Sequence, residues 1–330
     1  MDRTRLTVAM CTYNGARFLL HQLESIAAQT RLPNELVVCD DRSADESLEI
    51  VRSFAKRAPF PVRLEINEKN LGSTKNFEKA IGLCQGEIIA LADQDDVWKP
   101  RKLAVLEKTL EEHPEAGYVF SDAELVDVAG RPLGRTLWST IRFQGSVLRS
   151  FSGSRQVAIL LRRAAAQGAA TAFRSRLNSV LLPISPHFGH DYWISLLASS
   201  VALYGVAVRE QLIHYRQHDR QQIGPGSKSV VEKIRRAREE GAKGAGPYDC
   251  TTQGFQDVRE RLLLAASKGL SYPPNHLCLI EEKIAHCGQR AAAHSTRGTA
   301  KLSKVISEVL TGRYERYSDS WRSVVRDLCF

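Results

Sequence analysis

The first 120 residues alternate apolar runs with amphipathic segments, and this alternation limits the folds that the chain can adopt. Five apolar runs have the length of strands: residues 6–11, 35–40, 62–66, 87–92 and 117–122. Four segments between them have helical periodicity: residues 15–29, 43–57, 73–86 and 99–113. Near-continuous apolar strands that alternate with helices are typical of a parallel sheet covered on both faces. The sequence therefore predicts an α/β fold with a mostly parallel central sheet.

Two local signals predict where helices begin. Ser43 and Glu46 have the spacing of a capping box, which would start a helix at residue 43. Pro100 lies near the first position of the segment 99–113, where proline is favoured.

The later part of the chain predicts a different organisation. Residues 123–134 have the pattern of a hairpin, and residues 192–208 that of a buried helix followed by a strand. The sequence Gly-Pro-Gly at residues 224–226 is the best domain boundary, which divides the chain into residues 1–224 and a basic region, residues 225–330. Four helices are predicted in that region: residues 255–266, 275–287, 300–310 and the last twelve residues.

Composition places the chain among soluble globular proteins, with 43% hydrophobic and 25% charged residues. The longest uncharged run, residues 192–208, falls short of the roughly 20 residues that span a bilayer. The N-terminus lacks the apolar stretch of a signal peptide. The seven cysteines are odd in number and form no CxxC pair, which argues against a disulfide framework and a zinc site. We therefore expect a cytoplasmic protein.

The net charge of +9 is concentrated in the C-terminal region, where 18 Lys and Arg face 12 Asp and Glu from residue 225 onward. This suits an anionic partner such as a membrane surface, and it is equally compatible with solvated helix faces. The region lacks a basic stripe interleaved with aromatic residues, so nucleic acid is not an expected partner.

Polar residues follow four of the predicted strands at the point where each strand ends. They occupy residues 12–14, 40–41, 70–72 and 93–96. In open parallel sheets, ligands bind at the carboxyl ends of the strands. One polar cluster would be an ordinary loop, but four at the same edge predict a binding site.

The chemistry of that site is limited by what the sequence lacks. No P-loop and no GxGxxG fingerprint occur, so phosphates would need positive charge from elsewhere. Asp93 and Asp95 offer carboxylate oxygens at a strand end, and Mg²⁺ typically takes one or two carboxylates together with substrate phosphates.

Four motifs, in this order, resemble those of the inverting nucleotide-sugar glycosyltransferases of family 2, which have the GT-A fold: CTYNG, VVCDDRSADES, NLG and ADQDDVWKPRKL. The later segments AFRSRL, FGHDYW and YRQH resemble the bacterial rhamnosyltransferase branch, which works on surface polysaccharides. The resemblance covers about residues 5–224.

The resemblance implies a role for each cluster. These residues would bind the nucleotide-sugar: Thr12, Tyr13, Asn14, Asp40, Asn70, Gly72, Asp93, Asp96 and Arg216. Asp40 would accept the base's ring N–H, Asp41 would help to hold the loop, and Trp98 would pack beneath the acidic motif. Asp95 would ligate Mg²⁺ or Mn²⁺, with His218 as a second metal ligand. Asp191 would be the catalytic base.

The implied function is an inverting, metal-dependent transfer of a sugar from a dTDP- or UDP-sugar to a lipid-linked glycan acceptor, in the synthesis of O-antigen, capsule or cell wall. Rhamnose is the sugar that the branch suggests. The basic region would dock on the inner membrane face or form a homo-oligomer. Two departures concern the sugar side: Arg174 stands where the branch has Asn, and residues 219–222 lack its usual Gly and Asn.

Alternative interpretations remain for individual residues. The acidic motif could be a solvated loop, Asp40 and Asp191 could cap helices, and His218 could be structural. Two alternative functions also remain: a non-catalytic nucleotide-sugar-binding module, and a sugar-phosphate nucleotidyltransferase. The second usually needs a Gly-rich basic loop near the N-terminus, whereas CTYNGARF has one Gly and one Arg.

Overall fold

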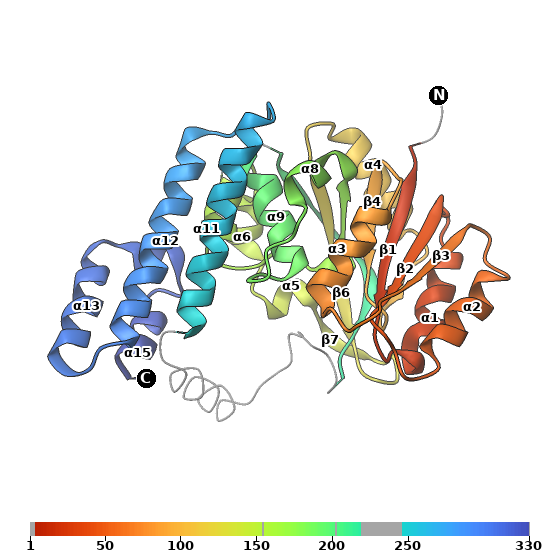
Figure 1. Cartoon of the computed structure of the whole chain (residues 1–330), viewed down its shortest axis with the longest axis horizontal. Helices are drawn as coiled ribbons and strands as arrows, with labels where there is room; N and C mark the ends of the chain where they lie inside the picture. Colours follow the sequence, from red (N-terminus) through yellow and green to blue (C-terminus); the bar gives the residue numbers. More distant parts are fainter. Residues whose placement is uncertain (1–3, 154, 202, 219–245, 330) are drawn as a thin grey trace. The chain divides into compact units, whose positions relative to one another are not determined.

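The computed structural model describes residues 4–153, 155–201, 203–218 and 246–329 of the chain (Figure 1). The chain forms two compact units, each described separately here. Unit 1 comprises Met1–Gly153, Ala165–Ser199 and Leu203–Pro225, and unit 2 comprises Ser154–Ala164, Ser200–Ala202 and Gly226–Phe330. The expected boundary at residues 224–225 lies outside the described residues.

The sheet of unit 1 begins with four parallel strands in the order β3-β2-β1-β4. Their bounds are β1 Leu6–Thr12, β2 Glu35–Asp40, β3 Val62–Ile66 and β4 Ile88–Ala92. Strands β1 and β4 are buried throughout, and β3 forms the edge. The predicted strands agree with these bounds to within one residue.

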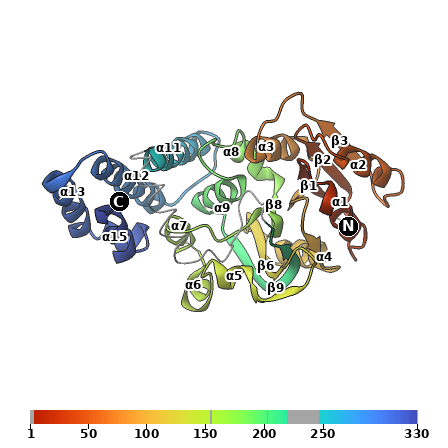
Figure 2. The same cartoon turned by 90° about the horizontal axis from the view of Figure 1, so that it is seen from below.

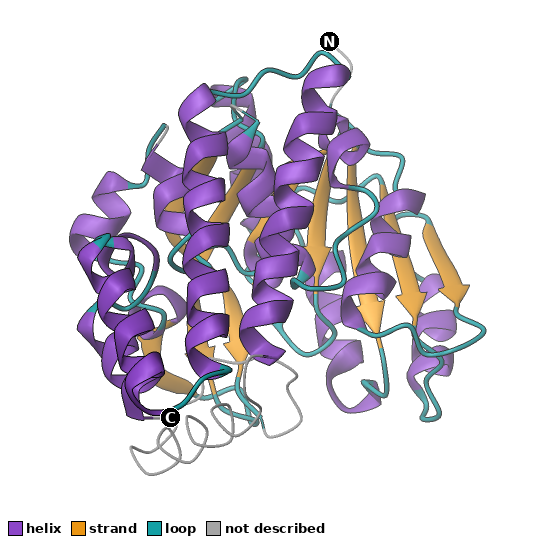
Figure 3. Cartoon of the chain, turned by 60° about the vertical axis from the view of Figure 1, so that its left-hand side comes forward, coloured by secondary structure: helices purple, strands orange, loops and turns teal. Residues whose placement is uncertain are grey.

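Helices cover both faces of these strands (Figures 2 and 3). Their bounds are α1 Ala16–Ala27, α2 Ser47–Ala55, α3 Ser73–Leu83 and α4 Lys102–Glu112. Right-handed crossovers place α1 and α2 on one face, because both lead toward β3, and α3 on the other, because it returns to β4. The α/β architecture with a mixed, mostly parallel sheet is therefore confirmed.

Two predicted helix starts are wrong. Helix α2 begins at Ser47, where the side chain of Asp45 accepts from the Ser47 N–H, while Ser43 donates to Asp40 in the preceding loop. Helix α4 begins at Lys102, two residues after Pro100. In both cases, residues that the local sequence pattern assigns to the helix belong to the preceding loop instead.

The second half of the sheet is mixed in direction. The strands are β5 Val97–Trp98, β6 Tyr118–Val126, β7 Pro132–Thr136, β8 Thr171–Arg174 and β9 Gly205–Arg216. Strand β8 lies between β4 and β6, antiparallel to both, while β9 runs parallel to β6. The predicted hairpin is confirmed by the antiparallel pair β6 and β7. Sequence reasoning missed β8, because four residues are too few to show a period.

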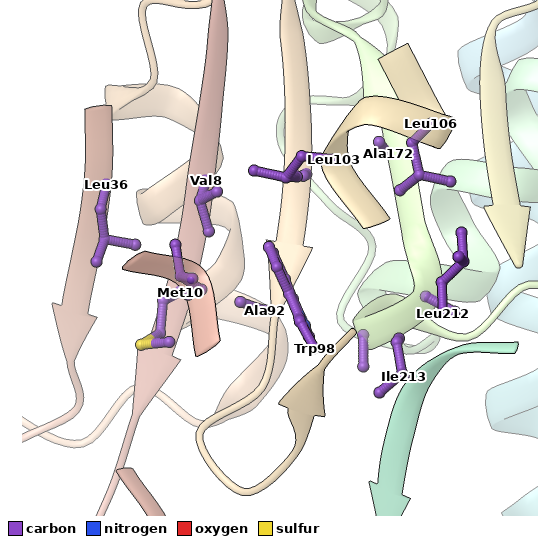
Figure 4. Close-up of a cluster of buried hydrophobic side chains, with 14 of the residues drawn as sticks. Val8, Met10, Leu36, Ala92, Trp98, Leu103, Leu106, Ala172, Leu212 and Ile213 are labelled. Carbon is purple, nitrogen blue, oxygen red and sulfur yellow. The ribbon is translucent and has the colours of Figure 1, made fainter. Parts of the chain in front are cut away.

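A single apolar cluster supports the sheet from the face of α1 and α4. Figure 4 shows Val8, Met10, Trp98, Leu103 and Leu106 packed together between strands and helix. Each fully buried side chain of this kind stabilises the fold by about 1.5–3 kcal/mol. The cluster fixes the strand ends on which the polar loops are mounted.

Short helices complete unit 1. They are α5 Leu137–Thr140, α6 Gly145–Ser150, η1 Gly168–Ala170, η2 Ser175–Leu177, α8 Asn178–Leu181 and α9 His190–Ser200. Phe120 of β6 packs against the rings of Trp138, Phe143 and Phe151, at centroid distances of 5.5–5.6 Å. The predicted helix and strand over residues 192–208 are confirmed by α9 and β9.

Unit 2 is helical. Its helices are α7 Arg155–Leu160, α11 Gly246–Ser267, α12 Pro274–His294, α13 Gly298–Leu310, α14 Arg313–Tyr317 and α15 Trp321–Cys329. The four helices predicted in the C-terminal region are present, α11 and α12 being longer than expected, and α14 is an addition. Among the described residues, no helix combines the length and the apolar character needed to cross a bilayer.

A buried polar network joins the helices of unit 2. Arg290 of α12 donates to Asp327 of α15 at 2.5 and 2.8 Å, and Tyr314 donates to the same carboxylate at 2.8 Å. Burial raises the pKa of Asp327, but hydrogen bonds from His294 and Arg290 outweigh it and hold the pKa well below its usual range. The network thus depends on a charged carboxylate.

Candidate active site

The carboxyl ends of β1, β2 and β4 meet at one edge of the sheet. Thr12 and Asp40 are paired in register at the ends of β1 and β2, and Met10 is paired with Ala92 at the end of β4. The acidic loop, residues 93–96, connects β4 to β5 at this edge. Three of the predicted polar clusters are therefore brought together by strand register, and the fourth joins them through Asp41, as described below.

Asp40 organises the end of β2. It is fully buried and accepts hydrogen bonds from the Thr12 hydroxyl at 2.7 Å, the Ser43 backbone N–H at 2.7 Å and the Ser43 hydroxyl at 2.6 Å. Three donors compensate its charge, which explains how a carboxylate is tolerated there. Two of these donors come from Ser43, three residues later, as expected if Asp40 acts as a cap. Ser43, however, lies in the loop before α2 and not in the helix.

The loop after β1 is clamped to the acidic loop. The side chain of Gln94 accepts from the Tyr13 N–H at 2.8 Å and donates to the Tyr13 carbonyl at 3.1 Å. A Cβ at Gly15 would overlap the Gln94 side chain, so the close approach requires glycine there. Asn14 accepts from the Ala44 N–H, and the ring of Tyr13 remains exposed. An exposed ring on a fixed backbone is free to stack on a planar ligand.

Asp41 holds the loop of residues 70–72. Its carboxylate accepts from the Leu71 N–H at 2.7 Å, the Gly72 N–H at 2.8 Å and the Asn67 amide at 2.8 Å. Asn70 donates to the Asp41 carbonyl at 3.2 Å. Gly72 has φ +78°, a conformation that favours glycine, and it precedes the first turn of α3. The predicted residues Asn70 and Gly72 thus lie beside the end of β2.

The acidic loop carries strongly shifted carboxyl groups. Burial, and then the charges of Asp95 and Asp191, raise the pKa of Asp93 to about 7. Burial and the neighbouring carboxylates also raise the pKa of Asp96 well above its usual range. Oδ1 of Asp96 accepts from the Arg216 backbone N–H at 3.0 Å, whereas its buried Oδ2 has no partner among the described residues. A buried, unpaired carboxylate oxygen is costly unless a cation or donor compensates it.

Strand β9 brings two further predicted residues to the acidic loop. His218 Nε2 lies 2.7 Å from Oδ2 of Asp95. Arg216 donates from Nε to the Asp95 carbonyl at 2.9 Å and from Nη1 to the Val128 carbonyl at 2.8 Å. Its guanidinium lies over the ring of Phe18, 4.7 Å from the centroid. In this geometry Arg216 fixes the acidic loop by its backbone contacts.

Asp191 stands in the first turn of α9. Its Oδ2 accepts from the Gly168 N–H at 3.3 Å and its Oδ1 from the Tyr192 N–H at 2.7 Å. Its charge raises the pKa of Asp93, so the two carboxylates share one electrostatic environment. The preceding residue, His190, is buried and stacks on Phe77 with centroids 3.8 Å apart, as expected of a structural histidine.

Lys102 is a component of the site that sequence reasoning missed. It is fully buried, with Nζ 3.3 Å from the centroid of the Trp98 ring and 2.5 Å from the Ala169 carbonyl. Burial lowers the pKa of Lys102 well below its usual range, while the charges of Asp96 and Asp93 oppose that shift. Trp98 is buried in the apolar cluster, and its role beside the acidic loop stays a prediction. The sequence feature that could have identified Lys102 is its position on the same helix face as Leu103 and Leu106.

The side chains that could ligate a metal at this site fit a hard divalent cation with few protein ligands. Among the described residues, no group of three or more His, Cys, Asp and Glu side chains is placed to enclose a metal. Asp95 and His218 form a two-residue set, beside the unpaired Oδ2 of Asp96. Mg²⁺ commonly takes few protein ligands and completes its shell with phosphate oxygens and water. The residues present are therefore compatible with a metal that arrives with a diphosphate.

Comparison with known proteins shows which family the N-terminal part is similar to. The family model described as "Glycosyl transferase family 2" matches residues 7–164. An uncharacterized glycosyltransferase of Nostoc sp. is 25% identical over 273 residues, which cover 81% of this chain and 79% of that protein. An uncharacterized glycosyltransferase of Bacillus subtilis is 34% identical over 123 residues, which cover 37% of this chain and 43% of that protein.

Solved structures agree with this fold. Residues 1–349 of S. aureus TarS in complex with UDP-GlcNAc superpose with a TM-score of 0.56 at 17% identity, covering 86% of this chain and 72% of that chain. A mannosyltransferase of Pyrobaculum calidifontis in complex with GDP-Man and Mn²⁺ gives a TM-score of 0.53 at 20% identity, covering 99% and 86%. Residues 7–164 of this chain therefore match the glycosyl transferase family 2 model, and the architecture is that of the GT-A fold.

Proposed function

We propose that this chain is an inverting, metal-dependent glycosyltransferase that uses a nucleotide-sugar donor. The observation that carries the proposal is that the polar loops after β1, β2 and β4 meet at one edge of the sheet, where Nε2 of His218 lies 2.7 Å from Oδ2 of Asp95. An acceptor-side base and a donor-side acidic loop belong together in such a reaction. A binding module would need the loop but not the base.

The donor would occupy the edge where the four loops meet. Tyr13 offers an exposed ring for the base, and Asn70 and Gly72 line the neighbouring loop. Asp40 would contact the base with any hydrogen-bonding capacity that its local partners leave. Asp93 would face the ribose and diphosphate. The complexes of S. aureus TarS with UDP-GlcNAc and of the P. calidifontis enzyme with GDP-Man support a nucleoside-diphosphate sugar as the donor class.

Asp95 and His218 would hold a divalent cation, which would stabilise negative charge on the departing diphosphate. Mn²⁺ in the P. calidifontis complex supports a divalent cation of this kind, either Mg²⁺ or Mn²⁺. Arg216 would act through its hydrogen bonds to the acidic loop, which keep Asp95 and Asp96 in place. Asp96 would complete the polar shell next to the sugar.

Asp191 would act as the general base. It would take the proton from an acceptor hydroxyl while that oxygen forms a bond to the anomeric carbon. The bond between the anomeric carbon and the diphosphate oxygen would break, and its electron pair would leave with the diphosphate. Attack from the face opposite the leaving group would invert the anomeric configuration.

The finer assignment follows the rhamnosyltransferase-like motifs AFRSRL, FGHDYW and YRQH. The donor would be a dTDP- or UDP-sugar, with L-rhamnose as the sugar, and the acceptor a lipid-linked glycan of a bacterial surface polysaccharide. Such an acceptor would place the protein at the inner face of the cytoplasmic membrane. Arg174, which differs from the branch, donates to the carbonyls of Ala116 and Leu110, a structural use of its guanidinium.

A thermal-shift panel would test the donor class and the metal together. The full chain is titrated with dTDP-, UDP- and GDP-sugars, with Mn²⁺, with Mg²⁺ and with EDTA. We expect a dTDP- or UDP-sugar to raise Tm only when a metal is present. The same donor is then assayed for sugar transfer, and Asp191→Asn should retain the Tm shift and lose transfer. A Tm shift with full transfer by Asp191→Asn would refute the base, and release of diphosphate from a triphosphate would indicate the nucleotidyltransferase.

A further inference from the structure

Helix α13 exposes an apolar stripe that the helical bundle does not use. Leu302, Ile306, Val309 and Leu310 are all exposed, and Leu310 is 81% exposed. Their spacing of four, three and one residues places them along one side of a helix. The side chains of α13 that face the bundle are different ones, Val305 and Glu308. The stripe is therefore not the packing seam of this helix.

Helix α15 repeats this arrangement. Trp321, Val325 and Leu328 are exposed at a spacing of four and three residues, and Trp321 is 66% exposed. The buried residues of α15 are Ser323 and Asp327. Thus the helix buries two polar side chains and exposes three of its large apolar ones, while Val324 packs against the apolar cluster of the bundle. Helices α13 and α15 contact each other, and both are labelled in Figure 2. We call these seven exposed apolar residues the α13–α15 stripes.

The acidic and the basic side chains of these helices differ in burial and in ion pairing. Of the four carboxylates in residues 298–329, Glu308 and Asp327 are buried, each paired within unit 2. Six Lys and Arg residues lie in the same segment. Four of these form no ion pair with any described residue: Lys301, Lys304, Arg322 and Arg326. These four cations outnumber the two exposed carboxylates of the segment, Glu315 and Asp319, and they lie on the polar sides of the same helices that carry the apolar stripes.

We propose that the α13–α15 stripes, with these four basic residues, dock unit 2 on an anionic lipid surface. An amphipathic helix with large apolar residues on one side and Lys or Arg beside them lies in the membrane interface, with its apolar side in the acyl boundary. Tryptophan is enriched at that level, and each basic residue near the surface adds attraction to anionic headgroups. The proposal deepens the membrane location in the proposed function, on which it rests.

A second copy of the chain is a less suitable occupant. A symmetric interface on this face would bring the basic residues of each copy close to those of the other, which is unfavourable. An anionic bilayer supplies both the apolar volume and the opposite charge.

Vesicle sedimentation of the full chain, without donor or metal, tests the proposal. We expect binding to vesicles of phosphatidylcholine with phosphatidylglycerol, weaker binding to phosphatidylcholine alone, and loss with added salt. Leu310→Ser with Trp321→Ser should weaken partitioning roughly tenfold or more. Lys304→Glu with Arg322→Glu should weaken it by a similar factor on the anionic vesicles.

Matched controls separate a surface effect from misfolding. Leu133→Ser, at an exposed leucine of β7, and Lys56→Glu, at an exposed lysine after α2, should leave partitioning unchanged. Each variant is checked for wild-type circular dichroism and for the donor-induced Tm shift, which stays intact if only the docking surface is altered. Equal partitioning of wild type and Leu310→Ser/Trp321→Ser would overturn the proposal. So would a concentration-dependent dimer that this double variant abolishes. Failure of the donor panel with vesicle binding intact would instead count against the proposed function.

Discussion

Nε2 of His218 lies 2.7 Å from Oδ2 of Asp95, although the two residues are 123 positions apart in the sequence. The contact joins the end of β9 to the acidic loop, and both side chains are largely buried. If this edge of the sheet binds a diphosphate, as proposed, the carboxylate and the imidazole form a pair that a divalent cation can bridge or separate. This relationship gives the first prediction.

Asp95→Asn should weaken metal-dependent donor binding by roughly tenfold or more, because the amide removes a charged ligand and the acceptor for His218. His218→Gln should weaken the same binding by a comparable factor. Isothermal titration of the donor with and without Mn²⁺ measures both effects. His214→Gln is the matched control, since His214 lies four residues earlier, on β9, and pairs with Glu124 instead. Equal affinities in wild type and Asp95→Asn, with Mn²⁺ present, would remove the metal role from Asp95.

Gly15→Ala should disturb the clamp between the first loop and the acidic loop. The new methyl group would overlap the Gln94 side chain, which would have to move and lose its two hydrogen bonds to Tyr13. We expect a loss of about 1–3 kcal/mol in the free energy of unfolding, together with weaker donor binding.

A double-mutant cycle with Gln94→Ala tests that cause. Gln94→Ala removes both the clamp and the steric conflict, so Gly15→Ala should add little in that background. Urea denaturation of the four proteins measures the coupling. Additive losses would mean that Gly15 is required for a reason other than the Gln94 side chain.

Lys102→Met should destabilise unit 1 more than its conservative shape suggests. The side chain is buried between the Trp98 ring and the Ala169 carbonyl, and its charge opposes those of Asp93 and Asp96. Removing the donor to a buried carbonyl typically costs about 1–3 kcal/mol. The free energy of unfolding measures the loss, with Lys108→Met on the exposed face of α4 as the control. A combined Lys102→Met/Asp96→Asn variant should recover part of it. No recovery would mean that Lys102 acts through Trp98 and Ala169 alone.

The sequence predicted β1, β2 and β4 well because their buried, nearly continuous apolar runs have few other interpretations, and β3, at the edge, was found from the alternation of its residues. It located the four loops for the same reason, since loops at the carboxyl ends of parallel strands share an edge. Residue roles within the loops depend on partners distant in sequence, and these were harder to foresee. Ser43 fits a helix cap locally, yet it donates to Asp40, and Gln94 shows no pattern that would point to Tyr13.

Lys102 illustrates a further limit. A lysine near the start of a helix is ordinarily read as solvated, and only the three-dimensional structure shows that Lys102 is fully buried against the Trp98 ring. The contacts of Arg216 could not be predicted from the sequence for the same reason, because the carbonyls that accept its hydrogen bonds belong to two separate loops.

Asp327→Asn should destabilise unit 2 in a pH-dependent manner. The folded pKa of Asp327 lies well below that of the unfolded chain, about 3.9, so the charged carboxylate stabilises the fold at all pH values above that figure. The stabilisation declines as the pH falls from there through the folded pKa. At pH 7, the loss of the ionic contacts to Arg290 should cost about 3–5 kcal/mol. Hydrogen exchange of α12 and α15 amides measures the opening free energy of this unit. The difference between Asp327→Asn and wild type should shrink progressively below pH 4, and Asp319→Asn, at an exposed carboxylate of the same unit, should change little at either pH. A difference that stays constant from pH 7 to strongly acidic conditions would show that Asp327 stabilises the unit through packing and neutral hydrogen bonds instead of through its charge.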